Sequence, residues 1–193
     1  EQDPLTHALT AIALASAGRP EEALVEMRRA SSFTPEEPAL ALSLARLEAE
    51  NGHFREAAEA ATVYLREASG DARLESWRDR MASRAALTAP HAHRAWNGVE
   101  VLWPAREVDA RRVDELTEIA HDVLFEVGSR IGVAPRRHLV VVIYRDLSEL
   151  RRATCAPSWS GGIFDGVLHL DAATVNGLTW ARVVRHESTH AQI

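Results

Sequence analysis

The sequence predicts an α plus α/β protein, in which an all-helical repeat module precedes an α/β domain. Three observations predict this organisation. Residues 4–69 repeat with a period of about 34 residues, which is typical of stacked helical hairpins. From residue 97 the apolar residues begin to alternate as they do in strands. Near the end of the chain, a predicted helix carries His186-Glu187-Ser188-Thr189-His190, a pattern with the spacing of two metal ligands.

The repeat superimposes small residues on small residues: Ala11 on Ala45, Gly18 on Gly52 and Ala23 on Ala57. Each unit is expected to form a helix, a glycine-containing turn and a second helix. The four expected helices cover residues 4–17, 21–32, 37–50 and 54–68. Two hairpins are too few to bury their own apolar faces, so we expect residues 71–88 to form a helix that caps them.

The expected domains are residues 1–89 for the repeat module with its capping helix, residues 90–96 for a linker, and residues 97–193 for the α/β domain. Pro90 breaks the helical pattern and marks the boundary. His91 and His93 follow it without an acidic neighbour in the linker, so they are expected to be solvated loop residues rather than metal ligands.

The α/β domain is expected to begin with a strand at Val99–Trp103, followed by a long amphipathic helix at Asp109–Arg130 and a buried strand at Leu139–Tyr144. Asp146 and Glu149 have the spacing of a capping box that opens a short helix. The Asp165-Gly166 dipeptide lies between two short apolar runs and predicts a hairpin.

Composition excludes several classes of function. All 22 basic residues are Arg and form no basic stripe, so the sequence does not indicate a nucleic-acid partner. The longest apolar run, Leu139–Tyr144, is far too short to span a bilayer. The only cysteine, Cys155, is expected to be a small buried residue. The absence of Lys and the many Ala residues favour a bacterial source, and a chain that starts at Glu1 is compatible with an extracytoplasmic location after loss of a targeting segment.

The histidine motif predicts half of a catalytic zinc site. On an α-helix, four residues advance about 400° and roughly 6 Å, so His186 and His190 lie on one face and can offer two imidazoles to one metal ion. Glu187 beside them is placed to accept a proton from a metal-bound water rather than to bind the metal. Residues 178–185 have apolar residues at helical spacing after a turn at Asn176-Gly177, which places the motif on a helix. The alternative is an ordinary hydrogen-bonded histidine pair.

Two family resemblances rest on these features. Residues 4–69 resemble the tetratricopeptide repeat family in their period and in the recurring Ala and Gly positions. Residues 97–193 resemble the N-terminal half of the peptidase MA-like domain, a gluzincin-type zinc peptidase domain that is often fused to such repeats in bacteria. The order of strand, long helix, strand, helix, Gly-rich hairpin and HExxH helix carries this second resemblance.

The second resemblance implies a zincin-like fold with a mixed sheet, an edge-strand hairpin and an active-site helix. It implies zinc as cofactor, His186 and His190 as ligands and Glu187 as the catalytic residue, with a third, glutamate ligand beyond residue 193. It further implies that an edge strand binds extended peptide substrate. The segment of this chain that matches that strand contains Val167, Leu168, His169 and Leu170.

The sequence therefore predicts a zinc-dependent peptidase whose repeats recognise a protein partner or substrate, although these 193 residues alone would be inactive for lack of the third ligand. The alternative is a protein-binding scaffold with an inactive or truncated peptidase-like domain. If the chain alone held zinc tightly, His169 or Asp171 would be the nearest upstream candidates for the third ligand. Trp159 and Phe164 are expected to lie in the core rather than in the wall of a cleft.

Overall fold

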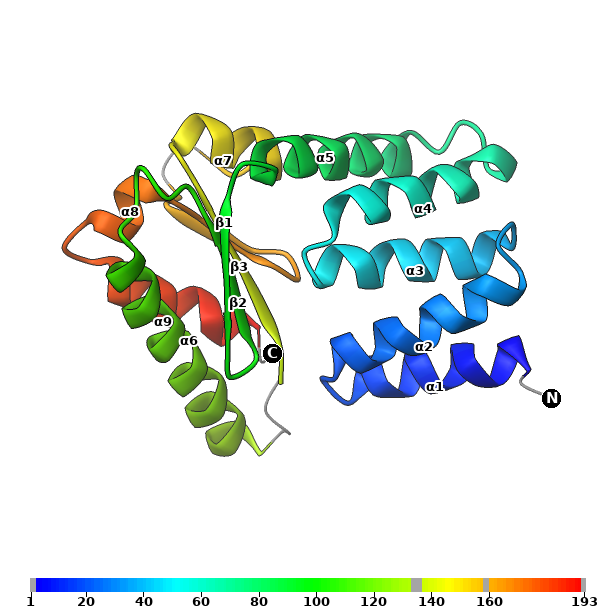
Figure 1. The fold of residues 1–193 in the computed structure, drawn as a ribbon, viewed down its shortest axis with the longest axis horizontal. Helices are drawn as coiled ribbons and strands as arrows, with labels where there is room; N and C mark the ends of the chain where they lie inside the picture. Colours follow the sequence, from blue (N-terminus) through cyan, green and yellow to red (C-terminus); the bar gives the residue numbers. More distant parts are fainter. Residues whose placement is uncertain (1–2, 133–136, 158–159, 192–193) are drawn as a thin grey trace. The chain divides into compact units, whose positions relative to one another are not determined.

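The computed structural model describes residues 3–132, 137–157 and 160–191, which form nine helices and a five-stranded mixed sheet (Figure 1). The chain divides into two compact units, Glu1–Ala85 and Ala86–Ile193. Trp159 lies outside the described residues. Among the helices described, none is both long enough and apolar enough to cross a membrane.

The first unit consists of two helical hairpins and a further helix. Its helices are α1 (Pro4–Ser16), α2 (Pro20–Phe33), α3 (Pro38–Glu50), α4 (Phe54–Glu67) and α5 (Ala72–Thr88), the last of which continues past Ala85. Helix α3 begins and ends one repeat period after α1, and α4 begins and ends one period after α2. Helix α5 likewise begins one period after the start of α3. The repeat in the sequence is thus a repeat of helix bounds.

Small residues at the recurring positions explain how the helices pack. The repeated alanines are fully buried: Ala11, Ala45, Ala23 and Ala57. Because an Ala side chain ends at Cβ, the paired helices can approach closely there. Gly18 and Gly52 occupy the turn of each hairpin with φ values of 70° and 77°, a left-handed conformation that other residues adopt at a cost. Leu74 and Trp77 of α5 pack against Ala45, Ala60 and Ala61, as expected of a capping helix.

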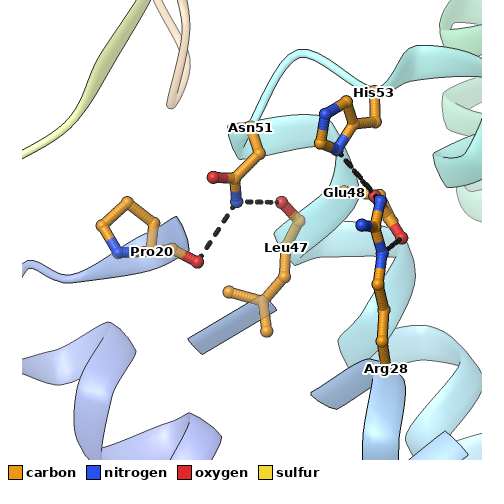
Figure 2. Close-up of polar contacts among 6 residues, drawn as sticks. All are labelled: Pro20, Arg28, Leu47, Glu48, Asn51 and His53. Carbon is orange, nitrogen blue, oxygen red and sulfur yellow. Dashed lines mark hydrogen bonds and ion pairs between the residues drawn. The ribbon is translucent and has the colours of Figure 1, made fainter. Parts of the chain in front are cut away.

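A buried carboxylate joins the two hairpins (Figure 2). The side chain of Glu48 on α3 accepts two hydrogen bonds of 2.7 Å from the guanidinium of Arg28 on α2, and its Oε2 lies 2.9 Å from Nδ1 of His53. Beside it, the amide nitrogen of Asn51 donates to the carbonyl oxygens of Leu47 at 2.7 Å and Pro20 at 3.3 Å. Both contacts tie the end of α3 to α2, so they fix how one hairpin follows the other.

The second unit is built on the sheet. Its elements are β1 (Ala92–Trp96), β2 (Val99–Trp103), α6 (Ala110–Ile131), β3 (Leu139–Tyr144), α7 (Leu147–Thr154), β4 (Gly162–Phe164), β5 (Leu168–Asp171), α8 (Ala172–Asn176) and α9 (Trp180–His190). The strand order is β1-β2-β3-β5-β4. The three inner strands are parallel to one another, whereas the outer strands β1 and β4 are each antiparallel to their neighbour.

One face of this sheet carries the core. Alternate residues of the inner strands, among them Val101, Val141 and Leu170, form one buried cluster with residues of α6, α8 and α9 (Figure 1). Helix α7 buries Leu150 and Ala153 outside this cluster, where it contacts β3 and β5. The core therefore holds α9 against the inner strands, and that contact positions the histidine motif.

Several expectations need correction. Residues 90–96 are not a linker, because Ala92–Trp96 pairs with β2 as a strand. His93 on this strand lies 3.1 Å from Glu100, while His91 is half-buried and contacts the carbonyl oxygen of Ile143 at 2.8 Å. Cys155 is exposed, because it takes a left-handed conformation at the end of α7 instead of entering the core.

The hairpin and the capping box are present as expected. Asp165 and Gly166 lie in the turn between β4 and β5, and Gly166 has a φ of 104°. The carboxylate of Asp146 accepts a 2.9 Å hydrogen bond from the amide of Glu149, and the carboxylate of Glu149 accepts one from the amide of Arg145, the residue before the cap. The motif helix begins at Trp180, with Thr179 as its N-cap. Asn176 is instead the last residue of α8, a short helix that the sequence had not indicated.

The Glu48 cluster predicts a maximum in the stability of the first unit between about pH 4.5 and 6.5. Burial raises the pKa of Glu48, but hydrogen bonds from His53 and Arg28 outweigh it, so the pKa lies below the usual 4.5. Its contribution to stability is present above that value and is lost as the pH falls through the folded pKa. The hydrogen bond to Glu48 raises the pKa of His53 above the usual 6.5. The contribution of His53 is full below that value and is lost as the pH rises through the folded pKa.

Glu48→Gln should flatten both limbs of this pH profile and lower the free energy of unfolding by about 1–3 kcal/mol, because hydrogen bonds to a charged group are lost. The lower half of that range is expected, since the side chains of Arg28 and His53 are 48% and 44% exposed. Urea unfolding, followed by circular dichroism from pH 4 to pH 8, measures the free energy of unfolding at each pH. The control is Glu59→Gln, which changes an exposed carboxylate of the same unit. An unchanged pH profile in Glu48→Gln contradicts the prediction.

Candidate metal centre

Helix α9 is held on the sheet by its apolar side. Val184 is fully buried in the core cluster, and Trp180 and Val183 pack against it. The guanidinium of Arg112 on α6 lies 4.7 Å from the centre of the Trp180 ring, close enough for a cation–π contact between the two helices. With this side anchored, helical geometry turns the side chains of His186 and His190 toward solvent, where both are exposed.

The two imidazoles converge on one point. The Nε2 atoms of His186 and His190 lie 3.4 Å apart, and the ring planes are inclined at 86° with centroids 5.0 Å apart. A nitrogen–nitrogen hydrogen bond of that length would be weak, because such bonds are usually nearer 3.0 Å. Two zinc–nitrogen bonds of 2.0–2.1 Å at a tetrahedral angle place the nitrogens about 3.3–3.4 Å apart. The pair thus has the separation of two ligands on one tetrahedral ion.

Glu187 points toward the edge of the sheet instead. Its side chain is half-buried, and its Cγ lies 3.2 Å from the position that a Cβ atom on Gly162 would take. Leu170 Cδ2 and Val183 Cγ1 lie 2.8 Å and 3.3 Å from the same point. Strand β4 can lie this close to α9 only because residue 162 has no side chain. Gly162 is therefore a site residue that the sequence prediction missed, and its only signal was the Gly161-Gly162 pair before the hairpin.

The segment expected to bind substrate is not an edge strand. Strand β5 pairs with β3 on one side and with β4 on the other, and Val167, Leu168, His169 and Leu170 are all buried. Its backbone groups cannot pair with an added peptide, so that interpretation is wrong for these four residues. Within the described residues, the strand at this edge of the sheet is β4, which carries Gly162 past Glu187.

The two upstream candidates for a third ligand are engaged elsewhere. His169 is fully buried between Tyr144 and Asp165, 3.1 Å from the tyrosine hydroxyl and 3.0 Å from the carboxylate. It alternates with Leu168 and Leu170, which face the α9 side, so it lies on the opposite face of the sheet. Asp171 accepts a 2.6 Å hydrogen bond from the amide of Thr174 and caps α8. In the part of the chain that the structure describes, no third His, Cys, Asp or Glu joins His186 and His190 in a cluster of ligand atoms.

Comparisons with known proteins identify no relative: no family model, no curated protein and no solved structure matches this chain. The assignment of the site therefore rests on its own geometry.

Gly162→Ala should lower the free energy of unfolding by about 1–3 kcal/mol, because the added methyl group overlaps Leu170 Cδ2 and Glu187 Cγ. Urea unfolding measures the loss. A double-mutant cycle with Leu170→Val identifies the cause: removing the nearest methyl group should cost less in the Gly162→Ala background than in the parent chain. Additive effects of the two substitutions would contradict the close approach.

Ser188→Ala should leave the stability unchanged or raise it by about 1–3 kcal/mol. The Oγ atom of Ser188 is buried and has no hydrogen-bond partner among the residues that the structure describes. The substitution therefore removes a buried polar group that is not compensated by a hydrogen bond. Thr189→Val is the matched control, because the Thr189 hydroxyl already donates a 2.8 Å hydrogen bond to the carbonyl oxygen of Arg185 on the exposed side of the helix, so its loss should not raise the stability as removal of the Ser188 hydroxyl can. Thermal unfolding compares the two variants, and a clear destabilisation by Ser188→Ala would refute the prediction.

Proposed function

We propose that the second unit is part of a zinc-dependent peptidase and that the first unit, related to tetratricopeptide repeats, recognises a protein partner. The observation that supports this most is the 3.4 Å separation of the Nε2 atoms of His186 and His190, which suits two ligands of one tetrahedral zinc ion. Both imidazoles are open to solvent, so an ion can reach them. A third protein ligand would lie outside the described residues, and a glutamate after residue 193 is the proposed source.

A zinc ion held there would act as a Lewis acid and lower the pKa of a water molecule to about 7. Glu187, one residue after the first proposed ligand, would accept a proton from that water as general base. It would then return the proton to the leaving amine as general acid. Its side chain is half-buried, and its Cγ atom lies beside Gly162, so the residue is near the edge strand. A peptide carbonyl group held along β4 would therefore lie near this side chain.

Strand β4 supplies the proposed peptide-binding edge. Among the residues that the structure describes, it pairs only with β5, and an extended peptide can add to its other side as a further strand through main-chain hydrogen bonds. Gly162, at the start of this strand, lies next to Glu187. This edge takes the role that the sequence had suggested for residues 167–170.

Substitution of each motif residue separates metal binding from proton transfer. His186→Ala and His190→Ala should each abolish the binding of Zn²⁺ to this chain, whereas Glu187→Gln should leave it unchanged. Binding to the unchanged chain is expected to be weak, because two imidazoles lack the third ligand. Calorimetric titration with Zn²⁺ measures this. Tightly held, stoichiometric zinc would place a third ligand within the chain or on a neighbouring copy, contrary to the proposal.

In a longer chain that carries the third ligand, Glu187→Gln should reduce peptide hydrolysis by on the order of 10²–10⁴ with unchanged zinc content. The amide keeps the size of the carboxylate but cannot take up the proton. Glu126→Gln is the control, since that carboxylate is exposed on α6 and pairs with Arg130. Undiminished hydrolysis in Glu187→Gln would refute the peptidase assignment.

The alternative function is a protein-binding scaffold with an inactive peptidase-like domain. The observation that favours it is that the described residues contain two of the three ligands that a catalytic zinc site needs. No hydrolysis by a zinc-loaded longer chain would shift the preference to this alternative.

A further inference from the structure

Strand β1 and helix α6 together carry an exposed aromatic cluster that neither the core nor the proposed zinc site explains. Trp96, the last residue of β1, is 44% exposed, and Phe125 on α6 is 64% exposed. The imidazole of His121 contacts both rings, with centroid distances of 5.4 Å to Trp96 and 6.2 Å to Phe125. A contiguous exposed apolar patch, unlike a single exposed residue, marks an interaction surface.

The turn after Trp96 holds the cluster in place. Asn97 and Gly98 have φ values of 45° and 79°, as in the tight two-residue turns that join antiparallel strands. The carbonyl oxygen of Asn97 accepts a 3.1 Å hydrogen bond from Nδ1 of His121, and that of Gly98 accepts one of 2.8 Å from the amide of Leu139. The turn is thus bonded both to α6 and to β3, so a ligand of the cluster meets a backbone that is already ordered.

Trp96 differs in its partners from two other tryptophans of this unit. The guanidinium of Arg94 lies 5.8 Å from the ring centre of Trp103, and that of Arg112 lies 4.7 Å from the ring centre of Trp180. Within the described residues, no arginine lies over the ring of Trp96. Tryptophan has the aromatic face that attracts cations most strongly, so the exposed ring of Trp96 can accept a cation from a partner.

The surface beside the cluster is acidic. Helical spacing puts Glu118 and Asp122 on the same side of α6 as the aromatic residues. Both carboxylates are exposed, and neither takes part in an ion pair with a described residue. The other acidic residues between 114 and 126 are paired: Asp114 with Arg94, Glu115 with Arg112 and Glu126 with Arg130. Among the described residues, the cluster is therefore bordered by two carboxylates that lack a counter-charge.

We propose that the patch formed by Trp96, Glu118, His121, Asp122 and Phe125 binds an arginine in a basic segment of another protein. The guanidinium lies on the exposed ring of Trp96 and donates hydrogen bonds to the neighbouring carboxylates, while an apolar side chain of the segment packs on Phe125. The opposite charges of patch and segment select this partner over an acidic one.

Arginine suits both contacts better than lysine. Its planar guanidinium stacks on an aromatic face and presents paired N–H donors to a carboxylate, whereas the ammonium of lysine is a compact and strongly hydrated charge. The same pairing already occurs inside this unit, where Arg94 lies over Trp103 and forms an ion pair with Asp114. The proposal does not depend on the zinc site, because none of its residues belongs to the histidine motif.

The test is fluorescence polarisation of the full chain with a fluorescein-labelled peptide, Gly-Leu-Arg-Leu-Arg-Leu-Gly. Two counterparts carry Lys or citrulline in place of each Arg, and citrulline keeps the shape of arginine without its charge. The Arg peptide should bind, with the Lys peptide about threefold weaker and the citrulline peptide at least about tenfold weaker. Absence of binding by the Arg peptide, or equal binding of the Arg peptide and either counterpart, would overturn the proposal.

Substitutions locate the binding. Trp96→Leu should weaken binding of the Arg peptide about fivefold, because leucine has no aromatic face, and Trp96→Phe should keep most of the affinity. The double variant Glu118→Gln/Asp122→Asn should weaken binding about tenfold. Its matched control is Glu59→Gln/Glu67→Gln, which removes two exposed charges from the first unit and should leave affinity within about twofold. Undiminished binding in Trp96→Leu, or equal loss in the two double variants, would show general attraction to an acidic chain and contradict the proposal.

Circular dichroism melting checks that each variant folds. A second measurement needs no substitution: nuclear magnetic resonance of the indole Nε1–H groups should show a shift at Trp96 when the Arg peptide is added. A shift at Trp77 of the first unit in its place would put the peptide elsewhere and overturn the proposal.

Discussion

The approach of strand β4 to helix α9 is the constraint on which the candidate site depends. A Cβ atom at residue 162 would come within 3.3 Å of Leu170, Val183 and Glu187, so only glycine lets the strand and the helix lie at their observed separation. The contact has two consequences. It places the sheet edge beside the Cγ atom of Glu187, and it leaves His186 and His190 on the solvent side of the same helix.

Helical geometry explains why the side chains of the motif lie on different sides of α9. Residues 186 and 190 lie one turn apart, and their Nε2 atoms converge to 3.4 Å because neither side chain is drawn into the core. Ser188, on the opposite side, is fully buried. Anchoring by Val184 and by the Arg112–Trp180 contact fixes the rotation of the helix about its axis. The separation of the imidazoles is thus a product of core packing some distance from them.

The two units bury separate apolar clusters, which suits two separate roles. In the helical unit, Ala11, Ala23 and Met27 pack in one cluster, and α5 closes another over Ala45 and Ala61. The buried Glu48 joins the hairpins by charged hydrogen bonds, which require a specific geometry and thereby hold α2 and α3 in register.

Local signals predicted most helices and the hairpin. Asp109 and Asp146 cap the helices that they were expected to open, and the period of the sequence repeat recurs in the helix bounds. The sequence could not place the strands relative to one another, because the order β3-β5-β4 depends on pairing between distant residues. The apolar residues Leu168 and Leu170 are as typical of an inner strand as of an edge strand, so they could not show which one β5 is. Strand β1 was missed because Ala92–Trp96 is mostly exposed and shows no apolar alternation. The sequence carries no local signal for the third ligand that the proposed zinc site would need.

X-ray absorption at the zinc edge tests the central claim most directly, with the chain in excess over Zn²⁺ so that only the best site fills. The geometry predicts two imidazole ligands at about 2.0–2.1 Å, with the outer-shell scattering typical of imidazole rings and the remaining positions filled by oxygen. In His186→Ala and in His190→Ala, the zinc should lose both of these imidazole ligands, because each substitution is expected to abolish binding at the site. A spectrum without imidazole scattering in the unchanged chain, or one that neither substitution alters, would contradict the account.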